Sequence, residues 1–313
     1  MSSYNPYLDA GIYTGHIDLR SEIIPQSRSF NCFPNEKCVP FPPSSTVPFP
    51  EIVKALQNNT ITPLDKTVVC LLATYEFMTN KQIADFLRLM GKEFSDNQLK
   101  SSTERLQRHL MTCSFKFGYN DTNVANFYVH TLLKNGSDLA RTLGVNHTFS
   151  PFAVGKLPAS IKQILAINQL QTSFLKSDLR VEWFRRGDTV SVPGSKSAIV
   201  RPSLTIKAND TVLMFEVVRT GEFWEHRLTD KLSRYKLVLD DWSNNSWGIT
   251  DDCSLVICGE NLAHNREIIE IARNVGIQVL FTEDILLCGS NFYRSIYDLE
   301  DPDVPTYYEY TPA

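Results

Sequence analysis

The sequence lacks the features that mark membrane, secreted and zinc-binding proteins. No apolar run approaches the ~18 residues that a membrane-spanning helix needs, and stretches such as Val68–Ala73 have the length of a core helix or strand. Residues Met1–Asn5 contain neither a basic region nor an apolar one, so we expect no secretory signal and a cytoplasmic location. The seven cysteines are irregularly spaced and give no zinc-finger pattern, which favours reduced thiols and no bound metal.

The composition also excludes the non-globular classes of protein. With 42% hydrophobic and 21% charged residues, the chain of 313 residues is neither wholly disordered, nor collagen-like, nor a coiled-coil rod. No internal repeat with a period of ~20–50 residues is visible. The length predicts two domains of roughly 150 residues each.

The net charge of −4 hides a separation of charge along the chain. Residues 151–240 carry 14 Lys and Arg against 9 Asp and Glu, a net charge of +5, whereas residues 241–313 carry 3 against 13, a net charge of −10. A basic segment attracts phosphate and an acidic tail can mask it, so we hypothesise an autoinhibitory contact made by the tail. The alternative is that the asymmetry only keeps the chain in solution.

The first half of the chain is expected to contain an arm and a helical domain. Residues 1–55 are interpreted as a proline-rich extended arm, because proline fixes φ and removes a backbone donor. Residues 56–150 change to helical periodicity with capping residues, followed by alternation typical of a hairpin. This order predicts a winged helix-turn-helix domain. Its expected elements are helices that begin at Thr62, Thr79 and Ser95, a hairpin over 113–119 and 127–129, and a helix over 136–143.

The third helix of this domain has the pattern of a DNA recognition helix. Apolar residues such as Leu99 and Leu106 lie on one face, and polar and basic residues lie on the opposite face. Asn and Arg suit bidentate contacts to base edges, and hairpin residues can contact phosphates. Glu104 lies on the same face and repels phosphate, and winged helices also serve as protein-interaction modules. The candidate DNA-binding residues are Asn97, Lys100, Ser101, Arg105, Arg108, Lys116, Tyr119 and Asn123.

The second half of the chain is expected to be an α/β domain with a mixed sheet. Residues 151–176 are interpreted as a linker helix, residues 177–300 as the domain, and residues 301–313 as an acidic irregular tail. The expected strands cover residues 179–184, 201–206, 212–218, 254–258 and 277–281, and the expected helices cover residues 228–239 and 265–275.

Two of these strands have the spacing of a metal-dependent nuclease site but not its chemistry. Such a site needs carboxylates that hold a divalent cation and a lysine that orients the attacking water. Glu216 supplies one carboxylate, but Ser203 occupies the position of the other and Val218 that of the lysine. We therefore expect a nuclease-like fold without an intact metal site, and Glu216 paired with Arg201 or Lys231. A magnesium cofactor belongs only to the alternative of a nuclease with a migrated active site.

The helix after these strands offers a second basic surface. Lys231, Arg234 and Lys236 lie on it and can contact DNA or a protein partner, or form an ordinary solvated face.

Seven short motifs follow one another along the chain: Thr62–Asp65, Met78–Ala84, Arg105–Leu106, Phe127–Tyr128, Arg201–Ser203, Phe215–Val217 and Lys231–Tyr235. In the order of these motifs the chain resembles the replication-relaxation family of plasmids and integrative conjugative elements. The resemblance covers about residues 60–240 and departs from the family at Pro202–Ser203, where the family usually has Pro-Asp. It implies a winged helix fused to a restriction-endonuclease-like domain that acts in DNA processing.

Three functions follow from these patterns. The first is an accessory protein that binds double-stranded DNA and recruits a relaxase or replication protein, with a homodimer left open because winged helices often bind as dimers. The second is a transcriptional repressor or antitoxin-like regulator. The third is a metal-dependent nuclease. Since Ser203 and Val218 break the nuclease motif, we favour a function without catalysis.

Overall fold

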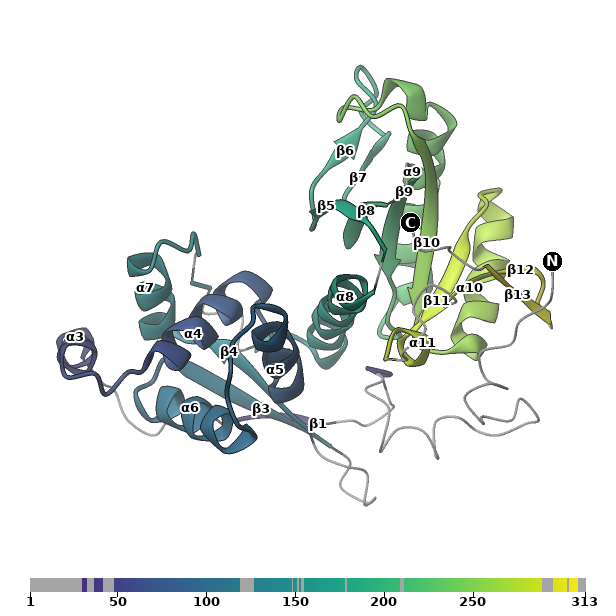
Figure 1. Ribbon diagram of the computed structural model, residues 1–313. Helices are drawn as coiled ribbons and strands as arrows, with labels where there is room; N and C mark the ends of the chain where they lie inside the picture. The colour runs from purple at the N-terminus through teal and green to yellow at the C-terminus, as the bar shows by residue number, and fades with distance from the viewer. Residues whose placement is uncertain are drawn as a thin grey trace. The chain divides into compact units, whose positions relative to one another are not determined.

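The chain is mixed α/β and divides into two compact units (Figure 1). One unit is Phe33–Asn168, and the other combines Met1–Cys32 with Gln169–Ala313. The computed structural model describes residues 30–32, 37–41, 48–118, 127–147, 149–150, 152, 155–177, 179–208, 211–288, 295–302 and 304–308.

The unit Phe33–Asn168 joins helices to a four-stranded antiparallel sheet with the order β1-β3-β4-β2. The short strand β2 separates two helices in sequence and pairs with β4, where Met78 lies opposite His130. The elements are β1 (Lys37–Phe41), α3 (Phe49–Gln57), α4 (Pro63–Tyr75), β2 (Met78–Thr79), α5 (Asn80–Leu89), α6 (Asp96–Arg108), β3 (Thr112–Gly118), β4 (Phe127–Leu132) and α7 (Lys134–Thr142).

Capping boxes determine where the three main helices of this unit begin. In each box a hydroxyl accepts a hydrogen bond from the third helical N–H, and the side chain at that third position accepts one in return. The predicted starts at Thr62, Thr79 and Ser95 are confirmed. They could be predicted because each capping box involves residues only three positions apart. The paired residues are Thr62 with Asp65, Thr79 with Gln82, and Ser95 with Gln98.

The predicted extended arm contains a helix that the prolines concealed. Helix α3 begins after Pro48 and accepts Pro50 in its first turn, where a missing N–H costs nothing. Ile52 and Ala55 are buried in the core of the unit. Upstream, β1 pairs with β3, with Cys38 opposite Phe117. The interpretation of residues 1–55 as an extended arm is therefore wrong over residues 49–55, which belong to α3.

Helix α8 (Pro158–Lys176) runs across the boundary between the two units. Its first part belongs to the unit Phe33–Asn168, where Asn168 Nδ2 donates to the carbonyl of Phe77 at 2.6 Å. Gln82 Nε2 donates to the carbonyl of Leu165 at 2.7 Å. The helix predicted as a linker is thus tied to the first unit by buried side-chain hydrogen bonds.

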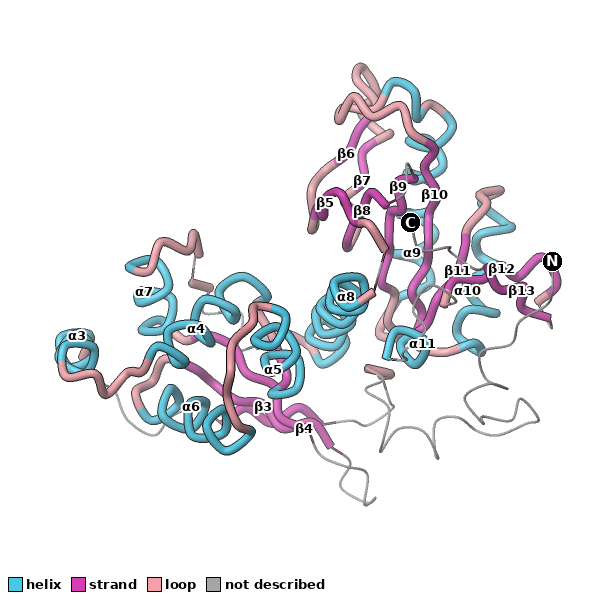
Figure 2. The backbone as a smooth tube through the Cα atoms, viewed as in Figure 1, coloured by secondary structure: helices cyan, strands magenta, loops and turns pink. Residues whose placement is uncertain are grey.

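The second unit is built on a seven-stranded sheet with the order β13-β12-β11-β10-β9-β8-β5 (Figure 2). Strands β9, β10 and β11 run parallel and are joined by helices, while the other neighbours are antiparallel. The elements are β5 (Val181–Arg185), β6 (Val190–Ser191), β7 (Ile199–Val200), β8 (Leu204–Ala208), β9 (Thr211–Val217), α9 (Trp224–Asp240), a 3₁₀ turn (Trp242–Asn244), β10 (Asp252–Gly259), α10 (Leu262–Val275), β11 (Leu280–Glu283), α11 (Asp284–Cys288), β12 (Ile296–Asp301) and β13 (Val304–Tyr308).

Strand β9 is buried on both faces. Met214 packs with Leu232 and other apolar residues of α9, whereas the ring of Phe215 meets Phe174 of α8 at 5.4 Å between centroids. Since side chains alternate along a strand, Glu216 lies on the face of Met214, toward α9. This alternation directs the Glu216 carboxylate toward Lys231 and Tyr235 of α9.

The tail predicted to be irregular forms a strand over Val304–Tyr308. Strand β13 pairs antiparallel with β12, and the rings of Tyr297 and Tyr307 lie 5.1 Å apart. Pro305 is tolerated because β13 is an edge strand. The prediction is wrong there because Asp and Pro concealed the alternation of exposed and partly buried residues.

Among the described residues, no helix combines the length and apolar character needed to cross a membrane.

Candidate nucleic-acid interface

Helix α6 presents a continuous polar face to solvent. Its opposite face is buried through residues such as Leu99, Thr103 and Leu106. Of the candidate DNA-binding residues, the exposed ones that the structure brings together on this face are Asn97, Lys100, Ser101 and Arg108, and Glu104 is exposed beside them.

A buried carboxylate holds α6 against α4. Asp65 is fully buried, and its Oδ1 accepts a hydrogen bond of 2.6 Å from Ser102 Oγ. Its Oδ2 accepts one of 2.8 Å from Arg105 Nε and one of 2.7 Å from the N–H of Thr62. Arg105 is therefore engaged in an ion pair and differs from the other candidates on α6. We assign it the positioning of the helix.

A second buried network ties the end of α6 to the hairpin. Ser114 Oγ on β3 lies 3.3 Å from Gln107 Oε1 on α6 and 2.9 Å from Nδ1 of His130 on β4. Burial lowers the pKa of His130 to about 4, so its imidazole is neutral at physiological pH. The hairpin and the polar face of α6 are thus fixed relative to each other.

The hairpin candidates are described only in part. Lys116 lies on β3 opposite Tyr128 on β4, and its side chain is partly buried. Tyr119 and Asn123 lie outside the described residues.

In the other unit, Glu216 forms a buried ion pair with Lys231. The carboxylate is 3% exposed, and its Oε2 lies 2.6 Å from Lys231 Nζ on α9. Tyr235 OH donates to the same oxygen at 2.9 Å, and burial together with this carboxylate raises the pKa of Tyr235. Of the two expected partners of Glu216, Lys231 is confirmed. Arg201 instead donates through Nε to the carbonyl of Gly187.

The side chains of Ser203 and Val218 are engaged in contacts that stabilise the fold. Ser203 Oγ accepts a hydrogen bond of 3.1 Å from the N–H of Val217, which joins the segment before β8 to β9. Val218 is buried in the apolar core beneath α9. Within the described ranges, no group of three or more His, Cys, Asp or Glu residues is arranged to hold a metal ion.

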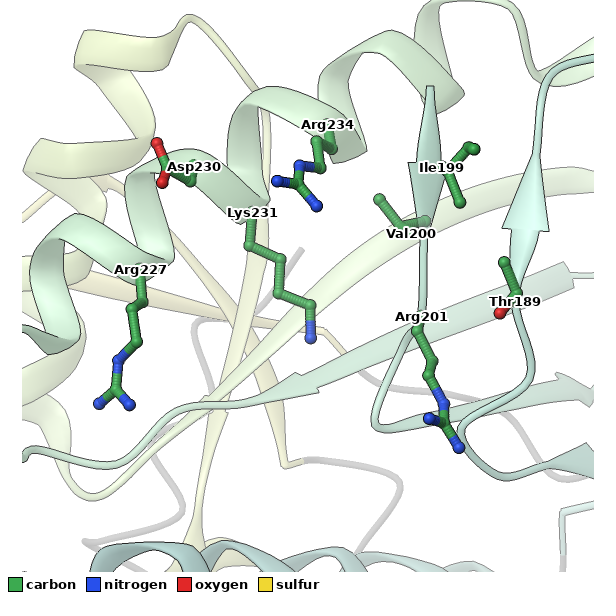
Figure 3. Close-up of a pocket in the computed structure, with 8 residues that line it drawn as sticks. All are labelled: Thr189, Ile199, Val200, Arg201, Arg227, Asp230, Lys231 and Arg234. Atoms are coloured by element: carbon green, nitrogen blue, oxygen red, sulfur yellow. The ribbon is translucent and has the colours of Figure 1, made fainter. Parts of the chain in front are cut away.

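A basic cavity of about 420 Å³ opens beside Lys231 (Figure 3). Lys231 and Arg234 share it, whereas Lys236 lines a different cavity and donates to the carbonyl of Val275 at 3.3 Å. The second basic surface expected from the sequence therefore divides into two places. The residues that line the first cavity are Thr189, Ile199, Val200, Arg201, Arg227, Asp230, Lys231 and Arg234.

Sequence reasoning missed a buried polar cluster at the carboxyl ends of β9, β10 and β11. Arg219 is buried and forms an ion pair with Asp284, whose other oxygen accepts from the N–H of Phe30 at 2.7 Å. Glu260 accepts from the N–H of Cys32 at 2.8 Å and from Thr220. The cluster fastens residues 30–32 to the sheet. The residues of this cluster are far apart in sequence, so no local sequence pattern predicts it.

Comparison with known proteins gives no family. Neither the protein families nor the curated proteins compared with the chain include a match. Among solved structures, the crystal structure of protein VC1899 from Vibrio cholerae aligns at 12% identity with a TM-score of 0.28. The alignment covers 80% of this chain and 56% of that chain, so the chain spans little more than half of that protein's length. At this TM-score the similarity assigns neither a fold nor a function.

Proposed function

We propose that the protein binds double-stranded DNA through α6 and serves as an accessory factor in plasmid or conjugative-element DNA processing. The observation that carries this proposal is the exposed face formed by Asn97, Lys100, Ser101 and Arg108, held in place by the buried Asp65. A reading helix needs polar side chains that can enter the major groove and a rigid apolar back. The proposed partners are double-stranded DNA and a relaxase or replication protein.

The element order supports a winged helix-turn-helix fold for the first unit. Helices α4, α5 and α6 are followed by the β3–β4 hairpin, and the short β2 between α4 and α5 pairs with β4. In this reading α6 is the recognition helix and the hairpin is the wing. The assignment to the replication-relaxation family remains part of the proposal and rests on the motifs of the sequence.

For the second unit we propose a nuclease-like fold that contacts DNA or a partner without cleaving. The hairpin β8–β9 followed by α9 and β10 supports that fold. Ser203 supplies a hydroxyl where the fold's metal chemistry needs an anion, and Glu216 is engaged by Lys231 and Tyr235. These contacts favour a binding role over cleavage.

Selection of duplexes from a random-sequence library tests the proposed function. Wild-type protein is expected to enrich a consensus, and Asn97→Ala/Lys100→Ala is expected to enrich none while binding DNA weakly. If wild type enriches no consensus, α6 does not read DNA and the first unit is a protein-interaction module. If the consensus maps to the promoter of a toxin-like neighbouring gene, the regulator alternative replaces the accessory factor.

A further inference from the structure

We propose that the basic cavity beside Glu216 is a seat for a backbone phosphate of DNA, in which the ammonium of Lys231 takes the place of a divalent cation. This inference rests on the proposed function in taking DNA as the ligand. It goes further in assigning the second unit a contact of its own, defined by phosphate and independent of base sequence.

The positive charges of the cavity come from two separate parts of the unit. Arg227, Lys231 and Arg234 recur at four- and three-residue intervals, which places them on one face of α9. Arg201 lines the cavity from the segment between β7 and β8, with its guanidinium turned away from α9 (Figure 3). The carboxylate of Asp230 points away from the Lys231 ammonium in the same view. The wall is therefore predominantly cationic.

Two of these cations are available to a ligand. In the part of the chain that the structure describes, neither Arg227 nor Arg234 forms an ion pair, and both are exposed. An arginine fork suits the paired oxygens of a phosphate. Each residue can thus add a charge-assisted contact without breaking an existing one.

Lys231 is fixed in position by the groups beneath it. Its Nζ lies 2.6 Å from Glu216 Oε2, and the same carboxylate oxygen accepts from Tyr235. An ammonium carries three donors, so contact with Glu216 leaves others for a ligand. In a metal-dependent nuclease, the metal ion lies between a protein carboxylate and the phosphate. In the proposed site the Lys231 ammonium lies in that place, with Glu216 on one side and the phosphate on the other.

The chemistry of the cavity selects an anion that carries an apolar group. Arg201, Arg227, Lys231 and Arg234 outnumber Glu216 and Asp230, so the site attracts negative charge. A volume of about 420 Å³ is in the range of small-ligand pockets and exceeds a phosphate group. Ile199 is 42% exposed on the wall and gives the sugar of a nucleotide an apolar surface. A sugar-phosphate unit of a DNA strand meets both requirements.

The salt dependence of duplex binding tests the proposal in the full-length protein. The probe is a fluorescent duplex without a selected site, titrated between about 50 and 200 mM salt. Arg227→Ala/Arg234→Ala is expected to weaken binding and reduce the slope of log affinity against log salt by ~0.9, because the cavity seats one phosphate and each lost phosphate contact contributes ~0.9. The control Arg180→Ala/Lys196→Ala also removes two exposed positive charges from this unit, at positions that do not line the cavity, and is expected to leave the slope unchanged. Equal slopes for wild type and the cavity variant overturn the proposal.

A second variant separates the seat from general electrostatics. Glu216→Gln/Lys231→Met leaves the net charge unchanged and leaves no buried charge without a partner. The seat predicts a slope lower by ~0.9 for this variant, whereas attraction by net charge alone predicts no change. An unchanged slope overturns the role of Lys231.

The remaining measurements distinguish the two proposals and the source of the phosphate. A cavity variant that lowers the slope in a protein without sequence preference supports the seat and contradicts reading by α6. Sequence preference with a slope that the cavity variant does not alter supports α6 and overturns the seat. Calorimetry with inorganic pyrophosphate adds the last arm, since tight binding lost in Arg227→Ala/Arg234→Ala, together with an unaltered DNA slope, assigns the cavity to a small phosphate ligand.

Discussion

The Nε atom of Arg105 lies 2.8 Å from Oδ2 of Asp65, a carboxylate with no exposed surface. This contact joins helices 40 residues apart in sequence. It connects the N-terminal capping box of α4 to the helix that we propose reads DNA. The position of the polar face of α6 therefore depends on a buried charge in another helix.

Arg105→Ala is expected to lower the free energy of unfolding by about 2–3 kcal/mol, because it removes a charged donor from a buried carboxylate. Lys100→Ala, on the exposed face of the same helix, is expected to change it by less than about 0.5 kcal/mol. Urea denaturation of both variants measures the difference. Equal stability of the two variants contradicts the positioning role of Arg105.

His130 predicts a loss of stability in acid. Burial lowers its pKa from 6.5 to about 4, so between these values the unfolded chain binds a proton that the folded chain does not. The contribution of the neutral His130 to the free energy of unfolding is fully present above pH ~6.5. It falls by about 3 kcal/mol as the pH drops to ~4. His130→Gln is expected to flatten this part of the pH profile of unfolding.

His226 supplies the control for this experiment, because its side chain is exposed. His226→Gln is expected to leave the pH profile of unfolding as in wild type. A profile that His130→Gln does not flatten contradicts a neutral buried imidazole at this position.

The pair of Glu216 and Lys231 is expected to show strong coupling. Lys231→Met alone leaves a buried carboxylate without its cation and is expected to cost about 3 kcal/mol of stability. Glu216→Gln/Lys231→Met is expected to recover most of that loss, since it buries no unpaired charge. A double-mutant cycle by chemical denaturation measures the coupling, and additive effects of the single changes count against the pair.

If the second unit is a nuclease, it is expected to nick supercoiled plasmid in the presence of Mg²⁺ or Mn²⁺. Because Ser203 is bonded to the backbone of β9 and Val218 lies in the core, we expect no nicking above a protein-free control. Nicking that requires the metal and is lost in Glu216→Gln establishes the alternative and replaces the binding role of the second unit.

Sequence predicted those parts of the fold whose causes are local. The helix starts at Thr62, Thr79 and Ser95 depend on residues three positions apart, and the hairpin depends on alternation within one segment. The strand expected over Ile277–Phe281 is found at Leu280–Glu283. Ile277 and Val279 are buried in the core although they precede the strand, so their apolar character did not mark where the strand begins.

The site could be predicted only in part because its contacts join distant segments. Lys231 was one of two expected partners of Glu216, and the spacing of α9 could not choose between it and Arg201. The contacts of Asp65 with Arg105 and of Arg219 with Asp284 span 40 and 65 residues. No periodicity in the sequence encodes such pairs, so they follow from tertiary packing alone.

Competition binding of duplexes tests most directly whether α6 recognises DNA sequence. The selected site and a scrambled duplex are compared for wild type and for Asn97→Ala/Lys100→Ala, with unfolding measured in parallel to show that both are folded. We predict that the variant loses its preference for the selected site, since each good base contact contributes about 1–3 kcal/mol of discrimination. A variant that is folded and keeps the wild-type preference contradicts the account.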